Sequence, residues 1–74
     1  MLYAEMDSDM MQIMVQDFVA DGAGEYDDLT IHYNSARYDA EMDSWVIDAE
    51  DETHDYLLVA DDEGNISIHT IGTK

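Results

Sequence analysis

The feature that most constrains this chain is its net charge of −17 over 74 residues, with 19 acidic residues against 2 basic ones. Self-repulsion at this density opposes compaction. Hydrophobic residues nevertheless make up 46% of the chain, including Trp45 and Phe18, which is enough apolar material for one core. We therefore expect residues 1–74 to form a single small folded domain.

The same charge excludes several partners. Membranes and nucleic acids are anionic and would repel this chain, and only Arg37 and Lys74 could contact a phosphate. No apolar run is long enough to cross a bilayer, and the start of the chain lacks the basic region of a signal peptide. We expect a soluble, cytoplasmic protein that contacts neither nucleic acid nor membrane directly, and whose natural partner is a basic protein.

The segment from Asp7 to Ala20 is predicted to be a helix. Met11, Met14, Val15 and Phe18 recur at i, i+3, i+4 and i+7, which is the spacing of one apolar helix face. Asp7 or Ser8 can cap its N-terminus, and the Gly22-Ala23-Gly24 cluster can end it.

From Asp28 onward the period changes to two, which is typical of strands. Leu29–Tyr33 and Ala36–Tyr38 form two short runs, and a third run, Trp45–Glu50, has Val46, Asp48 and Glu50 on its outward side. His54–Ala60 carries apolar residues on both faces and is predicted to be a central strand. A turn at Asp61–Asn65 then leads into the alternating run Ile66–Thr70. The sum predicts an α+β fold: one N-terminal helix packed on a three- to four-stranded antiparallel β-meander.

The carboxylates are candidates for imitating phosphates. Those at i and i+2 on a strand stand about 6.7 Å apart and neighbouring strands about 4.8 Å apart, spacings that a phosphate-reading surface accepts. The first candidate group is Asp48, Glu50, Asp51, Glu52, Asp55, Asp61, Asp62 and Glu63. The second candidate group is Asp27, Asp28, Asp39 and Asp43.

Two other uses of the charge stay open at this point. An Asp-rich, Lys-poor surface also suits a small interaction module adapted to very high salt, where carboxylates retain water and screening removes their repulsion. A divalent-cation-binding protein is the other alternative. However, counting Gly64 as position six of a calcium loop puts Val59 at position one, where a carboxylate is required. His32, His54 and His69 lie on three separate segments, so we expect no metal site and no cofactor.

Catalytic motifs are absent from the sequence. There is no cysteine, no serine flanked by nucleophile-elbow glycines and no phosphate-cradling loop. We expect the protein not to be an enzyme.

The methionines of the first segment have two interpretations: core filler, or a homodimer seam in which Met10 faces away from the sheet that Met11 contacts. Tyr33, Tyr38 and Trp45 are assigned to the core, although an exposed tyrosine could stack on a partner arginine.

Four features of the whole chain resemble those of a known class of proteins. They are its small size, its lack of cysteine, its acidic excess and the spread of its carboxylates along the chain. In these respects the chain resembles the small phage-encoded acidic DNA mimics, the anti-CRISPR and anti-restriction inhibitors. These families differ in fold and share no motif with this chain, so no site residue is carried over. The resemblance implies a stoichiometric inhibitor that occupies the basic nucleic-acid channel of a CRISPR effector, a restriction enzyme or another DNA-binding protein.

Overall fold

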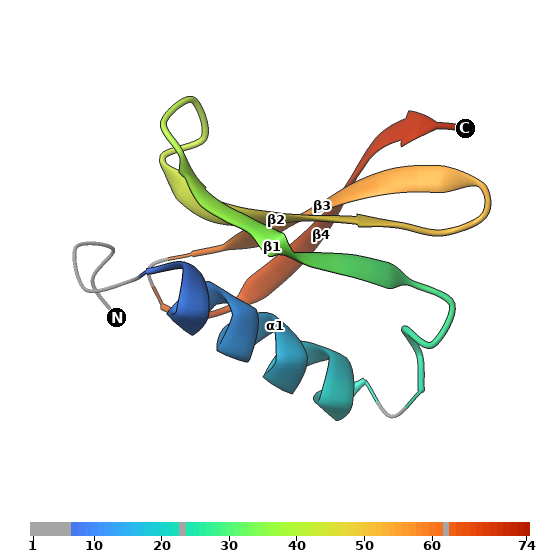
Figure 1. Cartoon of the computed structure of the whole chain (residues 1–74), viewed down its shortest axis with the longest axis horizontal. Coiled ribbons are helices and arrows are strands. Elements are labelled where there is room, and N and C mark those ends of the chain that lie inside the picture. The colour runs from blue at the N-terminus through green and yellow to red at the C-terminus, as the bar shows by residue number, and fades with distance from the viewer. Residues whose placement is uncertain (1–6, 23, 62) are drawn as a thin grey trace.

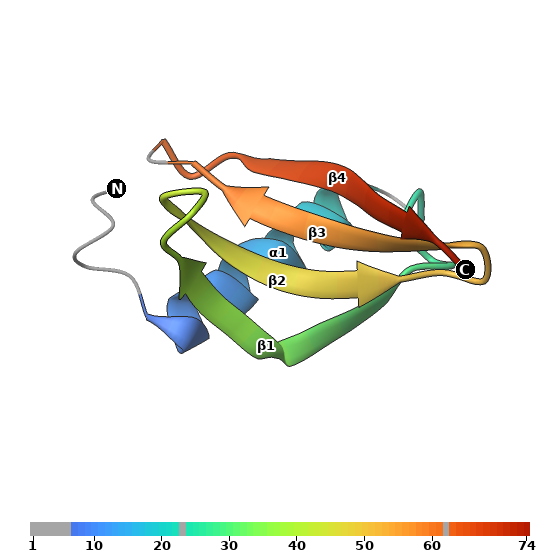
Figure 2. The same ribbon diagram turned by 90° about the horizontal axis from the view of Figure 1, so that it is seen from above.

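The computed structural model describes residues 7–22, 24–61 and 63–74. Helix α1 (Ser8–Asp21) packs across one face of a four-stranded antiparallel sheet in the order β1-β2-β3-β4, as Figures 1 and 2 show from two directions. The strands are β1 (Thr30–Asp39), β2 (Ser44–Glu50), β3 (His54–Ala60) and β4 (Ile66–Thr73). The predicted α+β fold with an N-terminal helix on a meander is confirmed.

Helix α1 begins and packs as its sequence predicts. Asp7 is the N-cap, and its carboxylate accepts a hydrogen bond of 2.8 Å from the Met10 N–H. Met11 and Val15 are fully buried and share one core cluster with Ile47 of β2 and Leu58 of β3. Met10 also packs against this cluster, so the prediction that it faces away from the sheet is wrong. The reason is that neighbouring residues on a helix are only about 100° apart, which lets Met10 reach the sheet beside Met11.

Gly22 ends the helix and makes room for the next aromatic residue. A Cβ at Gly22 would lie 2.6 Å from the ring of Tyr26. That ring stacks on Phe18, with centroids 4.9 Å apart. The glycine therefore lets the segment after α1 fold back onto the helix before β1 begins. Ala23, the middle residue of the predicted stop, lies outside the described residues.

The two short runs predicted at the start of the sheet are one strand. In β1 the register with β2 shifts between His32 and Arg37, and the strand bends there (Figure 2). Ser35 lies within the bend, where its hydroxyl donates to the His32 carbonyl and accepts from the Asp48 N–H. These bonds replace ladder hydrogen bonds, so the strand continues through a stretch whose pattern is typical of a break.

The central strands β2 and β3 bury residues on both faces. The helix face holds Ile47, Ala49, Leu58 and Ala60, while the opposite face holds a second cluster of Val46, Leu57 and Val59. The two-sided burial predicted for His54–Ala60 is confirmed. Val46 lies on the face opposite α1, as its alternation with Ile47 predicts, but it is fully buried there in the second cluster. The cause is its register, because Val46 lies between Arg37 of β1 and Val59 of β3.

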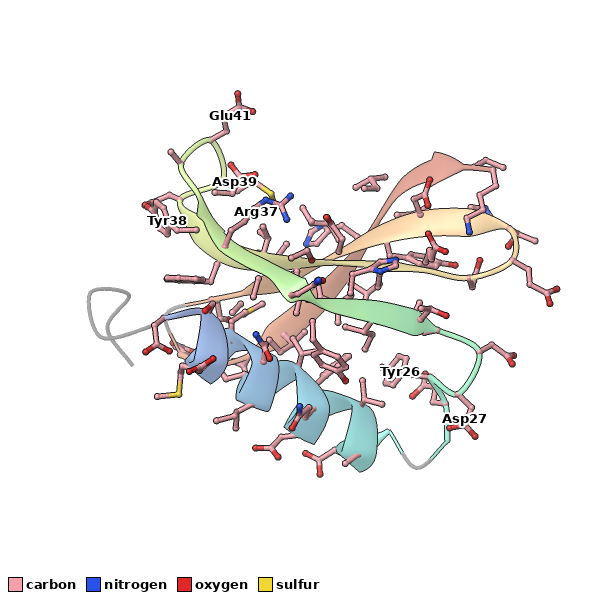
Figure 3. The ribbon with its side chains drawn as sticks, viewed as in Figure 1. Tyr26, Asp27, Arg37, Tyr38, Asp39 and Glu41 are labelled. Atoms are coloured by element: carbon pink, nitrogen blue, oxygen red, sulfur yellow. The ribbon has the colours of Figure 1, made fainter. Side chains whose placement is uncertain are left out.

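Tyr38 differs from its predicted core role. Tyr33 and Trp45 do pack against the main cluster. Tyr38 is 43% exposed, lies edge-on to Trp45 and donates its hydroxyl hydrogen bond to Asp43 in the hairpin between β1 and β2. Figure 3 shows this hairpin, with Asp39 and Glu41, rising from the side of the sheet opposite α1.

Candidate protein-binding surface

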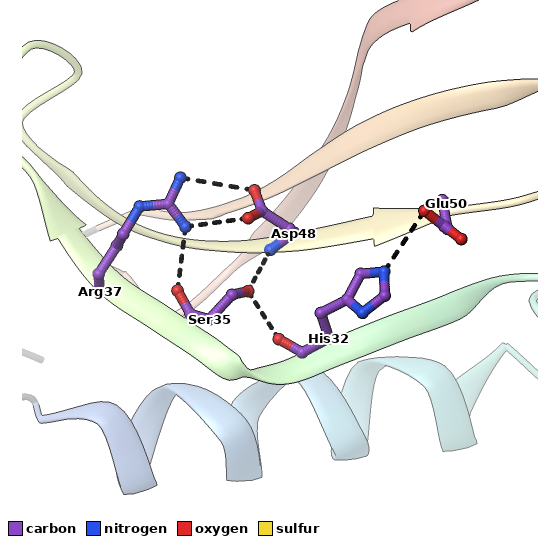
Figure 4. A network of polar contacts seen from close by, with 5 residues as sticks. All are labelled: His32, Ser35, Arg37, Asp48 and Glu50. Carbon is purple, nitrogen blue, oxygen red and sulfur yellow. Dashed lines mark hydrogen bonds and ion pairs between the residues drawn. The ribbon is translucent and has the colours of Figure 1, made fainter. Parts of the chain in front are cut away.

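Arg37 lies on the sheet face that α1 leaves uncovered (Figure 4). Arg37 forms an ion pair with Asp48 across β1 and β2, with Nη1 3.3 Å from Oδ2. Lys74 Nζ lies 3.4 Å from Glu50 Oε1, and His32 Nε2 lies 3.5 Å from the other Glu50 oxygen. Asp48 and Glu50 were predicted as an outward acidic pair. They do lie on that face, but each already has a cationic partner within the chain.

The pKa of Glu50 reflects this pairing. Its value is lowered because Lys74 hydrogen-bonds to the carboxylate and adds its positive charge, with a further hydrogen bond from His32. Glu50 and Asp48 therefore have part of their charge compensated before any partner arrives.

Asp51 holds the turn between β2 and β3. Its Oδ1 accepts hydrogen bonds of 2.8 Å from the Thr53 N–H and from the His54 N–H, and its Oδ2 accepts one of 2.7 Å from the Tyr56 hydroxyl. These donors, the Tyr56 hydroxyl first, hold the pKa of Asp51 well below its ordinary value. The same hydrogen bond raises the pKa of Tyr56. Asp51 is thus a fixed negative charge at the end of the sheet.

Other predicted site residues shape turns in a similar way. Asp39 Oδ1 accepts from the backbone N–H groups of Glu41 and Met42 in the β1–β2 hairpin. Asp61 Oδ1 accepts from those of Glu63 and Asn65 in the β3–β4 hairpin, and the Asn65 N–H is the main cause of its lowered pKa. Short acidic side chains at such turns are favoured because they hydrogen-bond nearby backbone.

The remaining predicted carboxylates have no hydrogen-bond or ion-pair partner within residues 7–22, 24–61 and 63–74. These are Asp27, Asp28, Glu52, Asp55 and Glu63. Asp28, Asp51 and Glu52 line one hollow of about 290 Å³, while Glu25, Asp28 and Asp51 line an adjacent one of about 280 Å³. We call Glu25, Asp28, Asp51 and Glu52 the acidic end of the molecule.

The structure divides the predicted residues between the two ends of the sheet. Asp27, Asp28, Asp51 and Glu52 lie in the loops at the end where β1 and β3 begin. Asp39, Asp43, Asp61 and Glu63 lie in the two hairpins at the other end, about 20 Å away for a strand of this length. Asp55 faces a third hollow with His32, Asp48 and Glu50. Asp62 lies outside the described residues.

One member of the acidic end was missed by the sequence reasoning. Glu25 lies in the same loop as Asp27 and Asp28, between α1 and β1 (Figure 3 labels Tyr26 and Asp27 of this loop). The sequence could have indicated Glu25, because it lies only two and three residues before Asp27 and Asp28. The ion pairs of Arg37 and Lys74 were also missed, because they depend on strand register and on where the last residue lies.

Comparison with known proteins finds no matching family model, no matching curated sequence and no matching solved structure. Within the part of the chain that the structure describes, no group of three His, Cys, Asp or Glu side chains is arranged to hold a metal ion. Among the same residues, no helix has the length and apolar character to span a membrane.

Proposed function

We propose that this protein is a DNA-mimic inhibitor that blocks the basic nucleic-acid-binding surface of a CRISPR effector or a restriction enzyme. It acts by steric and electrostatic competition, without catalysis or a cofactor, in the cytoplasm where such complexes meet DNA. The observation that carries the proposal is the acidic end, where partner-free carboxylates gather beside the fixed charge of Asp51.

The amount of charge suits this role. The molecule is 34 Å long and carries a net charge of −17. Duplex DNA of that length carries about 20 negative charges, because it has one per ~1.7 Å of axis. A channel lined with lysine and arginine would meet a similar total charge on a rigid folded body. Association would be fast and steeply weakened by salt.

The rigidity of the charge also supports competition. Ordering a long side chain on binding costs about 0.5–1.5 kcal/mol. Asp51 is held by the Tyr56 hydroxyl and by two backbone N–H groups, so it is ordered before a partner arrives. Asp28 has a short stem, which limits the same cost there.

A capture experiment tests the proposal. Tagged protein is incubated with a nuclease-treated bacterial lysate at low salt, and the bound proteins are eluted with duplex DNA or with an equal charge of polyglutamate. We expect a basic nucleic-acid-binding complex that duplex DNA releases and polyglutamate does not. Capture of assorted cationic proteins that both polyanions release equally would contradict the proposal.

Two variants with the same change in charge give the experiment a control. The acidic-end variant carries Glu25→Gln, Asp28→Asn and Glu52→Gln, none of which has an internal partner in the described structure. The helix-control variant carries Asp9→Asn, Asp17→Asn and Asp21→Asn on the exposed side of α1. We expect the first to lose capture and the second to keep it. Equal capture by both would place the binding surface elsewhere.

A further inference from the structure

Edge strand β4 is free of acidic residues, and edge strand β1 has only Asp39, its last residue. No Asp or Glu occurs from Leu29 to Tyr38, which covers nearly all of β1, or from Gly64 to Lys74, which covers all of β4. The central strands, by contrast, carry Asp48, Glu50 and Asp55. In a chain with 19 acidic residues, these two stretches of edge strand thus contribute no carboxylate of their own. Edge strands are where another chain can add by backbone hydrogen bonding.

The two edges are not equally suited to pairing. Strand β1 is interrupted by the register shift between His32 and Arg37, and bulges of this kind protect an edge. Strand β4 keeps an unbroken antiparallel register with β3 from Ile66 to Thr70, before a shift near its end. It carries no proline and no Asp, Glu, Lys or Arg. Strand β4 is therefore the open edge.

The hairpin between β3 and β4 determines which backbone groups point outward. The Asp61 N–H donates to the Asn65 carbonyl, so these two residues face each other as a hydrogen-bonded pair. Hydrogen-bonded and non-hydrogen-bonded pairs alternate along an antiparallel ladder. Following the register, Ile66, Ile68 and Thr70 direct their N–H and C=O groups away from β3.

We propose that β4 pairs antiparallel with β4 of a second copy of this chain, about a two-fold axis at Ile68. Ile66 of one copy then lies opposite Thr70 of the other, and the outward backbone groups of both copies are satisfied. Ile66 and Ile68 already pack against the main core cluster, so the two cores would meet along the helix faces. Ser67 lies opposite His69 on the other face, and no carboxylate of β4 enters the contact.

Charge favours a second copy, rather than a basic protein, as the chain that pairs with the edge of β4. A basic partner is attracted to the carboxylate-rich ends and central strands, and gains nothing from an acid-free edge. Two copies with a charge of −17 each repel one another and can approach only where carboxylates are fewest. Strand β4, which carries no carboxylate, is the strand best suited to such an approach.

The dimer can be tested separately from DNA mimicry, because salt affects dimerisation and binding to a basic partner in opposite directions. Screening weakens the repulsion between two like-charged copies and so strengthens the dimer. The same screening weakens attraction to a basic partner. The salt dependence therefore distinguishes a dimer that is not a DNA mimic from a DNA mimic that does not dimerise.

Sedimentation velocity over a range of protein concentrations, at about 0.05 M and about 0.5 M NaCl, tests the inference. We expect a dimer whose fraction grows with concentration and with salt. The variant Ser67→Asp with His69→Asp places like charges opposite each other on two exposed positions, which should raise the dimer dissociation constant about tenfold. Circular dichroism and the thermal midpoint check that this variant remains folded.

A control variant adds the same number of acidic residues elsewhere. Asn34→Asp in β1 and Gln16→Glu on α1 are both exposed positions. We expect this control to dimerise like the unmodified chain. A chain that stays monomeric at high salt and concentration, a dimer that survives both aspartates in β4, or a dimer that the control abolishes would overturn the inference.

Discussion

Single aspartates in this protein have two different uses, which their neighbours determine. Asp51 and Asp61 accept several hydrogen bonds and hold turns, whereas Asp28 has no such bonds and is available to a partner. The amino-acid composition does not distinguish Asp51 and Asp61 from Asp28. The candidate site could therefore be predicted from the sequence as an acidic surface, but the residues that make turns could not be separated from those left open, because the difference depends on which N–H groups lie within reach.

The hydrogen bond from Tyr56 to Asp51 makes part of the stability depend on pH. The pKa of Asp51 is lowered in the folded protein, so its stabilising effect is complete above the ordinary value of 3.8 and is lost as the pH falls. We expect Tyr56→Phe to lower the thermal midpoint near neutral pH, and the difference from the unmodified chain to shrink at acid pH. Thermal unfolding followed across the pH range measures this.

Tyr33→Phe is the control for that comparison, because Tyr33 packs against the core and its hydroxyl has no partner in the described structure. A deficit in Tyr56→Phe that stays constant with pH, or one that Tyr33→Phe reproduces, would contradict the role given to Asp51.

Gly64 is required by the β3–β4 turn. Its φ is +87°, in the left-handed region that favours glycine. We expect Gly64→Ala to reduce the free energy of unfolding by about 1–2 kcal/mol. Gly72→Ala is the control, since no atom lies within 4 Å of the added Cβ and φ is not in that region. Urea denaturation of both variants should separate them, and equal stability would show that the turn tolerates another conformation.

At the scale of elements, the helix was the best predicted part. Its apolar spacing and its cap are local, and α1 begins and ends within one residue of the predicted bounds. The break in β1 was not predictable, because Ser35 bridges it to Asp48, a residue distant in sequence. The full burial of Val46 was not predictable for the same reason, since its cover comes from strand register. Long-range pairing therefore accounts for both differences.

The N-cap of α1 gives a direct test at this scale. Asp7→Ala removes the acceptor of the Met10 N–H and should lower the free energy of unfolding by about 1 kcal/mol. Asp7→Asn should retain most of the stability, because asparagine caps helices as well. Ser8→Ala should have little effect, as Ser8 lies within the helix. Chemical denaturation compares the three, and a larger loss in Ser8→Ala would identify Ser8 as the cap.

At the scale of the whole molecule, charge and folding oppose one another. The core is small, and the net charge of −17 repels itself over a body whose thickness is 19 Å. Beyond the two ion pairs, carboxylates lie at both ends of the sheet, on the exposed side of α1 and on β3. We expect such a molecule to be stabilised by modest salt without requiring molar salt to keep its core.

Salt therefore separates this account from adaptation to high salt. In dilute buffer we expect the far-ultraviolet circular dichroism of a folded α+β protein. Raising NaCl from about 0.01 M to about 0.5 M should increase the thermal midpoint by about 5 °C, as screening weakens the repulsion. An unfolded spectrum in dilute buffer that becomes native only in molar salt would favour the high-salt alternative.

The most direct test of the central claim is competition with DNA. Fluorescence anisotropy follows a labelled duplex bound to each of several guide-loaded CRISPR effectors and restriction enzymes while this protein is added. We expect stoichiometric displacement from at least one of them, about tenfold weaker for the acidic-end variant and unchanged for the helix-control variant. No displacement from any of them, or equal weakening by the two variants, would contradict the claim that the acidic end imitates DNA.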